Sequence, residues 1–423
     1  MNTRLPDNIW PLPSAEPEQV EVSSDRLARI GPTLGRFVER EMDPNFVTLV
    51  ARHGKIVHYH AQGYMDFESR KPAGLDTIYR LWSNTKPITG VATMICVEDG
   101  LISLDDPVSK YITAFKNQRV RAPAPQGPML GTPTAPVDRD ITIRDCLRNT
   151  TGLATARQAP LSYATEFKDV ISQAGLIGGV GPAAHNIRER LNALAKLPLE
   201  SQPGSRFEYQ VGYPIVGVVL ETATGKTLEE FYQERIFGPL GMKDSSFYLD
   251  ESKLDRFPTL YRPIQKEGEW KLAVDEEPGK SEKVTGPRTY FEAGGGGGGV
   301  LSTAGDYARF AQMLLNKGEL DGVRIIGRKS FELMTSSHTG DIDVMGRPGF
   351  GFGMGVGVKT GEGIPSYRSI GTFGWGGAAG TTFYVDPKED LFGICFTQVF
   401  SHNFMPGNTY QEDFERMVYE SLM

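Results

Sequence analysis

The sequence predicts an α/β fold in which one sheet is built from both ends of the chain and a mostly helical domain is inserted between them. Three changes of texture support this fold. β-Branched residues gather near the start in "FVTLVARHGKIVHYHAQGYMD", helical signals dominate from about 141 to 250, and glycine-punctuated strands such as "GTTFYVDP" follow from about 286. Strands, then helices, then strands again are typical of a sheet that is closed by distant segments.

The same changes set the expected domain boundaries. Residues 1–21 are rich in proline and acidic residues and are expected to form an N-terminal extension over the surface. One α/β domain takes residues 22–116 and 286–423, and residues 117–285 form the inserted domain, with the active site expected between the two. With 423 residues, of which 39% are hydrophobic, the chain can bury a sizeable core.

The first expected elements are a helix and a pair of strands. In "SSDRLARIGPTLGRFVEREM", serine and aspartate are preferred N-caps, and the apolar residues after them recur at helical spacing: Leu27, Ile30, Leu34 and Phe37. The two strands of "FVTLVARHGKIVHYHAQGYMD" are expected to join at a turn from His53 to Lys55.

Helical periodicity marks the middle and the end of the chain. "AAHNIRERLNALAKLPLE" and "TLEEFYQERIF" predict helices in the inserted domain, and "TYQEDFERMVYESLM" predicts a closing amphipathic helix. Between them, "GFGFGMGVGV", "GTTFYVDP" and "DLFGICFTQVF" have the glycine and β-branched composition of strands.

Composition and charge disfavour several classes of protein. The net charge is −7 with a pI near 5.6 and the chain has no block of Lys and Arg, so a nucleic-acid partner is not expected. The chain has neither an apolar run of about 18 residues nor an apolar stretch for a signal peptide near Met1, so a cytoplasmic protein without a membrane partner is expected. The cysteines are odd in number and widely spaced, which disfavours a disulfide or zinc framework: Cys96, Cys146 and Cys395.

The segment "LWSNTKPITG" places Ser83 and Lys86 three residues apart at the start of an expected helix. Serine is a preferred N-cap, and Pro87 falls in the first turn, where a missing N–H costs little. Residues at i and i+3 share one helix face, and a buried lysine that has lost its proton can activate a serine hydroxyl. The alternative is a capping serine beside a solvated lysine, because about one S-x-x-K is expected by chance in a chain of this composition.

Five ordered segments favour the catalytic alternative. "YRLWSNTKPITGVATMICVEDGLISLDDPVSKYI" resembles the nucleophile segment of the serine β-lactamase and penicillin-binding-protein superfamily, and in particular the class C β-lactamase-like branch with the family VIII carboxylesterases. "ITIRDCLRNTTGL" resembles that branch's "HTSGL" segment, with Asn149 in place of the histidine. The series continues with "PGSRFEYQVGYPIVGVVLETATGKTLEEFYQERIFGPLGMKDSSF", "GGGGGGVLSTAGDYARFAQMLLNKG" and "FGWGGAAGTTFYVDP", and covers most of residues 22–423.

The resemblance implies a β-lactamase-like fold, an antiparallel sheet flanked by helices with a mostly helical inserted domain. It implies that Ser83 is the nucleophile and that Lys86 and Tyr209 exchange its proton. Tyr209 matches the tyrosine of the family's Y-x-N motif, although Val211 replaces the asparagine. A phenol near Ser83 and a cationic Lys86 is expected to have a lowered pKa. Tyr213 is the alternative phenol.

The family's third motif has two candidates. Lys359-Thr360-Gly361 spells it literally, but the strand that should follow it comes after Trp375-Gly376-Gly377. Trp375 is therefore assigned to the family's lysine position, and Lys359 is expected in a loop. By the resemblance, the oxyanion hole is formed by the backbone N–H groups of Ser83 and Ala378. The residues expected to contact substrate are Trp82, Val211, Trp375, Gly376 and Gly377.

Three other motifs are interpreted as structural. His58 and His60 point to one side of a strand but lack a third metal ligand, so no metal site is expected. The glycine run 294–299 lacks the Gly-Lys-Ser/Thr ending of a phosphate loop and is expected to allow close packing or to form a flexible rim. The chain contains no G-x-S-x-G, so an α/β-hydrolase elbow is not supported.

The sequence therefore predicts a serine hydrolase, most simply a carboxylesterase of short-chain acyl esters that needs no cofactor. The alternatives on the same fold are a β-lactamase, a D-amino-acid peptidase or amidase, and an acyltransferase; Val211 and Trp375 disfavour the first two. A further alternative is a catalytically silent binding protein, against which the retention of Ser83, Lys86 and Tyr209 argues. The expected partner is a small-molecule ester, and the sequence does not determine the oligomeric state.

Overall fold

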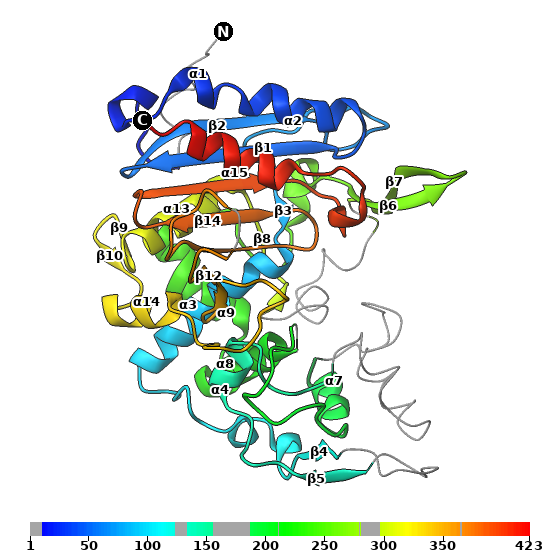
Figure 1. Ribbon diagram of the computed structural model, residues 1–423, viewed down its shortest axis with the longest axis vertical. Helices are drawn as coiled ribbons and strands as arrows, with labels where there is room; N and C mark the ends of the chain where they lie inside the picture. Colours follow the sequence, from blue (N-terminus) through cyan, green and yellow to red (C-terminus); the bar gives the residue numbers. More distant parts are fainter. Residues whose placement is uncertain are drawn as a thin grey trace.

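A seven-stranded antiparallel sheet forms the centre of the protein (Figure 1). The computed structural model describes residues 11–122, 133–154, 187–209, 211–278, 280, 297–363 and 366–423. Within them the strand order is β11-β12-β13-β14-β15-β1-β2. The strands are β1 (Asn45–Arg52), β2 (Lys55–Gly63), β11 (Phe350–Phe352), β12 (Gly357–Lys359), β13 (Phe373–Gly376), β14 (Thr382–Asp386) and β15 (Leu391–Phe396).

The sheet is built from both ends of the chain, as the sequence predicted. β15 pairs with β1, so that Val47 lies opposite Phe396. β1 and β2 form a hairpin through the expected turn at His53 and Gly54. All seven strands are antiparallel to their neighbours, which confirms the predicted fold class.

Helices from opposite ends of the chain cover one face of the sheet. α1 (Ser24–Leu27), α2 (Ile30–Glu39) and α15 (Tyr410–Glu420) lie side by side at the top of Figure 1. Their apolar residues share a core with β1, β14 and β15, and this core contains all four residues of the expected first helix stripe. The predicted closing helix is therefore confirmed in its place in the chain and in its amphipathic character.

The other face is covered by helices that surround α3 (Thr85–Glu98). α13 (Ala304–Leu315) packs on β1, β14 and β15, while α8 (Gly212–Thr224) and α14 (Arg328–Thr335) pack on α3. The first twelve residues of α3 are buried, which fixes its N-terminus rigidly. The remaining helical elements are α4 (Ile143–Leu147), α7 (Ile187–Leu194), α9 (Leu228–Tyr232), the π-turn η6 (Gln233–Phe237) and α10 (Gly238–Leu240).

Short hairpins and 3₁₀ turns complete the described chain. The strand pairs are β3 (Tyr79–Arg80) with β8 (Leu301–Ser302), β4 (Arg119–Arg121) with β5 (Thr134–Pro136), β6 (Leu260–Lys266) with β7 (Glu269–Glu276), and β9 (Glu319–Leu320) with β10 (Val323–Arg324). The 3₁₀ turns are η1 (Pro17–Val20), η2 (Trp82–Asn84), η3 (Val108–Lys110), η4 (Thr113–Phe115), η7 (Glu251–Arg256) and η9 (His402–Phe404).

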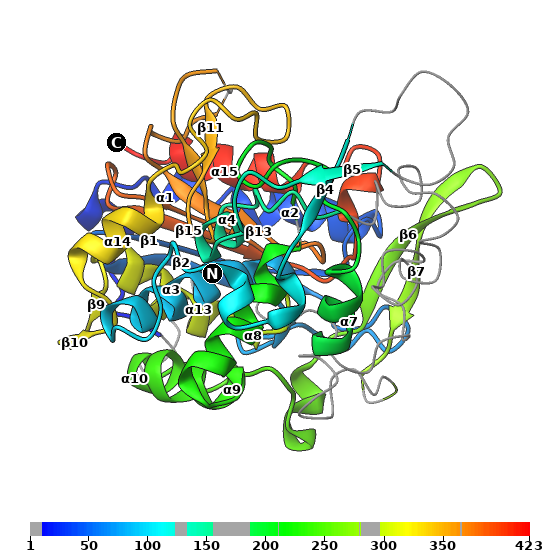
Figure 2. The same ribbon diagram turned by 90° about the horizontal axis from the view of Figure 1, so that it is seen from below.

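The segment expected as an inserted helical domain, residues 117–285, also contains the hairpins β4–β5 and β6–β7. The β6–β7 hairpin extends to one side of the molecule, away from α14, in both views (Figures 1 and 2). Tyr261 at its base bridges to Val399, beyond the end of β15. This hairpin therefore packs on the expected α/β domain, and the domain boundaries stay a prediction.

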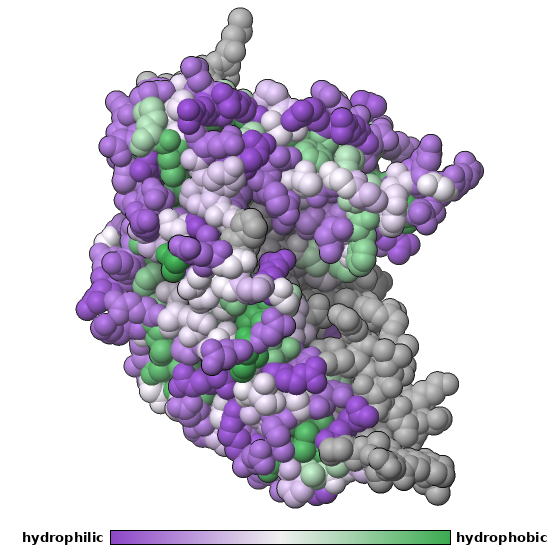
Figure 3. Space-filling view, in the orientation of Figure 1, coloured by the Kyte–Doolittle hydropathy of each residue, from purple (hydrophilic) through white to green (hydrophobic). Residues whose placement is uncertain are grey.

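The segment before α1 meets the residues that follow α15. Val22 pairs with Leu422, and Ser23 N–H donates to the Ser421 carbonyl at 2.8 Å. On the face seen in Figure 3, hydrophilic residues predominate and hydrophobic ones are scattered among them. Among the helices that the structure describes, none has the length and apolarity that a membrane span requires.

Candidate active site

Ser83 lies in η2 at the start of α3, directly beside Lys86. Lys86 Nζ donates hydrogen bonds to Ser83 Oγ at 2.9 Å and to the Gly297 carbonyl at 2.8 Å. The spacing of three residues puts both side chains on one side of the first helical turn. The two residues are therefore in contact; the N-cap of α3 is Asn84, so the alternative of a capping Ser83 beside a solvated lysine is wrong.

Burial changes the chemistry of Lys86. Its residue is 3% exposed, and this burial lowers the pKa of the amine from 10.5 to about 7. The nitrogen lies 4.9 Å from the ring centroid of Tyr209 and 5.4 Å from that of Tyr213. At neutral pH much of the amine is therefore the free base, which can accept a proton from the Ser83 hydroxyl.

The backbone before Ser83 is held in an uncommon conformation. Trp82 has a φ of +49°, in the left-handed region that bulky residues rarely adopt. Leu81 N–H donates to the Val300 carbonyl at 3.0 Å, and the Leu81 carbonyl accepts from Thr381 Oγ1 at 2.9 Å. These contacts hold Trp82 and, with it, Ser83 in place. The Trp82 ring packs on Phe400 at a centroid distance of 4.9 Å.

The structure brings Tyr209 to the same place from a distant part of the chain. Its hydroxyl accepts a hydrogen bond from Trp375 Nε1 at 2.7 Å. Burial raises the pKa of Tyr209 to about 12, although hydrogen bonds with Ser83 and Trp375 act in the opposite direction. The expected lowering of this pKa is therefore wrong, because the loss of solvation outweighs the two hydrogen bonds.

The hydroxyl of Tyr213, the alternative phenol, makes its hydrogen bond away from Ser83. Tyr213 is fully buried in α8, and its hydroxyl donates to the Leu147 carbonyl at 2.6 Å. Lys86 Nζ lies over its ring, but its hydroxyl contacts helix α4. The geometry therefore favours Tyr209 over Tyr213 as the phenol next to Ser83.

Trp375 lies on β13 within a cluster of aromatic rings. Its ring is 5.5 Å from Tyr209, 4.9 Å from Phe352 and 6.3 Å from Phe350, measured between centroids. Phe207 stacks on Tyr209 at 6.3 Å and contacts Phe352 at 5.5 Å. Trp375, which the resemblance assigns to the family's lysine position, therefore offers an apolar face and one N–H, which is already donated to Tyr209.

Val211 is the N-cap of α8, half-buried against the main apolar core. It follows Tyr209 by two residues, as the asparagine of the family motif would, but it offers no polar group. The neighbouring Gly212 lies against the backbone of Cys146, where a Cβ would approach the carbonyl to 2.1 Å. This contact fixes the start of α8, and with it the position of Val211.

The turn from Gly377 to Gly380 joins β13 to β14 and packs against the residue before Trp82. A Cβ on Gly377 would lie 2.2 Å from the Leu81 carbonyl, so this position requires glycine. Gly376 closes β13 with more room, its nearest neighbour being the Thr381 carbonyl. The turn is thus placed beside the backbone that leads to Ser83.

The Ala378 and Gly380 carbonyls of this turn are occupied, whereas the N–H groups of Ala378 and of Ser83 beside it are available. Ser401 N–H donates to the Ala378 carbonyl at 2.7 Å, and Tyr410 Oη donates to the Gly380 carbonyl at 2.7 Å. Within the described residues, neither Ser83 N–H nor Ala378 N–H donates a hydrogen bond. An oxyanion hole needs donors that are free in the resting protein, so both groups meet this requirement.

A buried carboxylate supports the segment that carries Tyr209. Asp145 accepts hydrogen bonds from Arg139 at 2.5 and 2.9 Å and from Arg148 at 2.9 Å. Helix α4, which carries Asp145, is followed by Asn149, which has a φ of 58° and whose carbonyl accepts from Glu208 N–H at 2.6 Å. Asn149, which the resemblance places at the family's histidine, therefore holds the backbone directly before Tyr209.

Several other sequence motifs lie outside this constellation. Lys359 is the last residue of β12 and not part of a loop, so that expectation is wrong. Its Nζ donates to the carbonyls of Ser366 and Arg368 at 3.2 and 2.6 Å, which leaves it a structural residue. His58 donates to or accepts from Thr48 Oγ1 at 2.7 Å, and burial lowers its pKa to about 3.

Cys96, Cys146 and Cys395 are free and buried. In the ranges that the structure describes, no group of three or more His, Cys, Asp and Glu residues is placed to hold a metal ion.

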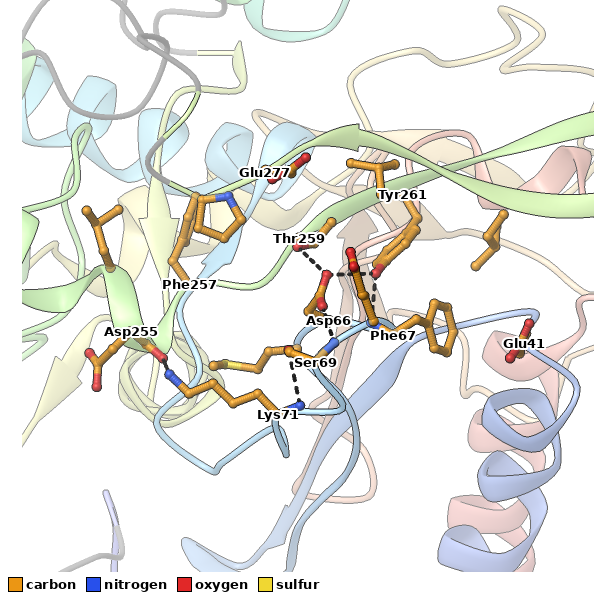
Figure 4. A pocket seen from close by; sticks show the side chains of 16 residues that line it. Glu41, Asp66, Phe67, Ser69, Lys71, Asp255, Phe257, Thr259, Tyr261 and Glu277 are labelled. Carbon is orange, nitrogen blue, oxygen red and sulfur yellow. Dashed lines mark hydrogen bonds between the residues drawn. The ribbon is translucent and has the colours of Figure 1, made fainter.

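Two of the cavities in the described part of the chain bear on the site. One, of about 520 Å³, is lined by Ser205, Arg206, Phe207, Asp341, Ile342 and Asp343, and is therefore joined to the Ser83 constellation through Phe207. The other, of about 480 Å³, lies between the loop after β2 and the β6–β7 hairpin (Figure 4).

The cavity of Figure 4 is linked to Trp82 through Tyr261 and Phe400. Asp66, Thr259 and Tyr261 point toward one another in it, and Asp66 accepts from both hydroxyls at 3.2 Å. The Tyr261 carbonyl accepts from Phe400 N–H at 2.7 Å, and Phe400 carries the ring that packs on Trp82. None of the predicted site residues lines this cavity.

Gly297 contacts Lys86, a role that the sequence did not predict. It lies in the glycine run, and its carbonyl receives the second hydrogen bond of Lys86. A Cβ on Gly297 would lie 3.1 Å from Tyr213 Cβ and 3.8 Å from Lys86 Nζ, which explains a small residue here. Residues 294–296 of the run lie outside the described residues.

The fold and this geometry have counterparts among known proteins. The family model "Beta-lactamase" matches residues 34–414. "Uncharacterized protein MT1414" of Mycobacterium tuberculosis is 34% identical over 83% of this chain and 85% of its own. "Esterase EstB" of Burkholderia gladioli is 29% identical over 83% of this chain and 85% of its own.

A solved structure with the same fold is that of "EstCE1, a hydrolase with promiscuous acyltransferase activity". It matches with a TM-score of 0.75 and 25% identity, over 93% of this chain and 99% of that one.

Proposed function

The chain belongs to the Beta-lactamase family and is a serine hydrolase of that superfamily, and from this premise we propose that it is a carboxylesterase of short-chain acyl esters. The observation that carries the proposal is the hydrogen bond from Trp375 to Tyr209. Trp375 stands at the position that the resemblance assigns to the family's lysine. Its indole carries no charge that could pair with a substrate carboxylate. The similarity to Esterase EstB and to the hydrolase EstCE1 supports the same choice.

Ser83 Oγ attacks the ester carbonyl carbon, and its proton passes to Lys86 Nζ. Lys86 is the base because its pKa of about 7 leaves free amine at neutral pH, whereas Tyr209, with a pKa of about 12, is protonated there. The carbonyl oxygen becomes an oxyanion, which accepts hydrogen bonds from the backbone N–H groups of Ser83 and Ala378.

Collapse of this intermediate breaks the bond to the alcohol. Tyr209 donates its proton to the departing alkoxide oxygen and recovers one from Lys86, so the alcohol leaves neutral and the acyl group stays on Ser83. Water then attacks the acyl-enzyme by the same proton path in reverse and releases the carboxylic acid. The proposed partner is thus one small ester and water, and the reaction draws on no cofactor.

The substrate class follows from what the site lacks. A charge-assisted hydrogen bond to a substrate carboxylate contributes about 1.5–3 kcal/mol, and Trp375 cannot supply it. Val211 likewise supplies no amide for a substrate's amide group. A neutral ester loses neither contact, so we expect p-nitrophenyl acetate to hexanoate to exceed a chromogenic cephalosporin by at least about a hundredfold in kcat/KM.

The test combines a covalent probe with this ratio. A fluorophosphonate should add once to the intact protein, and peptide mapping should place it on Ser83, with Ser83→Ala as the unlabelled control. Labelling of another serine, or the lack of labelling in a folded sample, would overturn the assignment of the nucleophile. Equal kcat/KM for ester and cephalosporin would overturn the substrate class and leave the nucleophile standing.

A further inference from the structure

The side of the site on which the alcohol leaves can be placed from Tyr209. In the proposed mechanism, on which this inference rests, the phenol hands its proton to the alkoxide oxygen as the bond to the acyl carbon breaks. That oxygen must then lie within hydrogen-bond reach of Tyr209 Oη. The remainder of the alcohol has to continue past this phenol, and the acyl chain has to take another direction.

Past Tyr209 lies an aromatic wall. Phe207 stacks on Tyr209 with an angle of 16° between the ring planes, and it also contacts Phe352. Phe207 is half-buried, so part of its ring is covered by these neighbours and part is open. A flat apolar group next to Tyr209 would meet this ring before it meets solvent.

The open side of Phe207 faces a space large enough for such a group. The cavity of about 520 Å³ has Phe207 and Ile342 as its apolar walls. Cavities of 300–1,000 Å³ are typical of small-molecule sites, and they combine apolar walls with a few polar groups. This cavity is thus sized for an aryl or arylalkyl group.

The charges at the rim exclude anions. Arg206 pairs with Glu208 at 3.0 Å, which balances its charge. Asp341 and Asp343 also line the cavity, and in the described part of the chain neither forms an ion pair. An alcohol with a carboxylate would therefore meet two carboxylates without a free cation, whereas an uncharged aromatic alcohol would not.

We propose that the cavity lined by Phe207 and Ile342 is the subsite for the alcohol part of the ester, and that it selects uncharged aryl or arylalkyl alcohols. The acyl part, which stays on Ser83, does not enter it. The protein would accordingly be an esterase with a short acyl side and a bulky aromatic alcohol side. Chain-length preference and alcohol preference are then set by different residues.

The test compares esters that share one acyl group. Because kcat/KM reports the steps up to release of the alcohol, benzyl acetate should exceed ethyl acetate by about tenfold or more in the wild type. Phe207→Ala, which removes the wall, and Ile342→Trp, which fills the cavity, should each lower this benzyl-to-ethyl ratio at least about fivefold. The ratio is used because any general loss through Tyr209 cancels from it.

Two comparisons separate this subsite from its alternatives. The profile from p-nitrophenyl acetate to hexanoate, whose alcohol is constant, should keep its shape in both variants; a change there instead would place the acyl chain in the cavity and overturn the proposal. Trp270→Ala, an aromatic deletion on the distant β6–β7 hairpin, should leave the benzyl-to-ethyl ratio unchanged. 4-Carboxybenzyl acetate should be at least about tenfold poorer than benzyl acetate, and equality would overturn the charge selection.

Failure of the subsite and failure of the proposed function look different. If benzyl acetate leaves one acetyl group on Ser83 in the intact mass but both variants keep the wild-type ratio, the subsite is wrong and the esterase stands. If no ester acylates Ser83, the function itself is wrong. Ile342→Trp adds volume at a half-buried loop position, so it keeps the test decisive should Phe207→Ala fail to fold.

Discussion

Replacing Lys86 with methionine should raise the stability of the protein while removing its activity. Methionine keeps the length of the side chain without the amine, and Lys86 is 3% exposed. Folding lowers the pKa of this amine from 10.5 to about 7. The folded state therefore holds fewer protons than the unfolded state between these two values, and this difference costs stability.

The size of the cost follows from the two pKa values. At pH 7 the unfolded amine is charged and the folded amine is half charged, which corresponds to about 4 kcal/mol. The variant also loses the hydrogen bonds of Lys86 to Ser83 and Gly297. Those bonds contribute about 0.5–1.5 kcal/mol each, and a carbonyl left without its donor adds to the loss. A net gain of about 1–2 kcal/mol in the free energy of unfolding is expected.

The pH dependence gives the sharper test. The cost is complete below pH 7, where the charged amine is buried, and it vanishes as pH rises through 10.5, where the unfolded lysine also loses its proton. From pH 6 to pH 9 the advantage of Lys86→Met over the wild type should shrink by about 2–3 kcal/mol.

Urea unfolding of both proteins at pH 6, 7, 8 and 9 measures this advantage. Ester hydrolysis should fall at least about a hundredfold in Lys86→Met and persist in Lys359→Met, whose amine lies outside the site. A stability advantage that is constant with pH, or that grows toward pH 9, would refute the buried free base.

Three further outcomes are expected. Tyr209→Phe should lower kcat at least about a hundredfold. Tyr213→Phe should keep kcat within about tenfold of the wild type, because the Tyr213 hydroxyl is bound to a backbone carbonyl. The reverse order in steady-state kinetics would move the proton path to Tyr213. Trp375→Lys should raise kcat/KM for an anionic cephalosporin relative to p-nitrophenyl acetate by roughly tenfold, and an unchanged ratio would show that this position does not set the substrate charge. Asp145→Asn should lower the free energy of unfolding by about 3 kcal/mol, since it leaves two arginines without their buried carboxylate, and a thermal or urea transition at the wild-type midpoint would contradict that support.

The parts of the fold that the sequence predicted are those with strong local signals. The β1–β2 turn, the stripe of the first helix and the closing helix are each defined within about twenty residues of sequence, where periodicity and caps act. The contact between Ser83 and Lys86 is also local, because residues three apart meet on any helix. That both ends of the chain share one sheet was predicted by a different argument, from the order of strands and helices along the whole chain; which strands pair, β1 with β15, is known only from the structure.

What the sequence could not supply depends on burial and on distant contacts. The second acceptor of Lys86, the Gly297 carbonyl, comes from a glycine run without periodicity, and a backbone group has no signature in sequence. The sign of the Tyr209 pKa shift was wrong because charge and hydrogen bonding can be guessed from a motif, but desolvation cannot. The bond from Trp375 to Tyr209 needs the folded arrangement of β13 and the segment before α8.

The pairing of β1 with β15 has a consequence for how the protein is made in a cell. The β1–β2 hairpin leaves the ribosome early, but the strand that lies against β1 ends at Phe396. At about 5–20 residues per second, roughly 20–70 seconds of translation separate the two. During that time the unpaired edge of β1, a buried and apolar strand in the finished protein, can add to another nascent chain. A lower growth temperature and chaperones that shield nascent strands should therefore affect the yield of this protein more than its final stability does. A chain released before Leu391 would carry that open edge permanently.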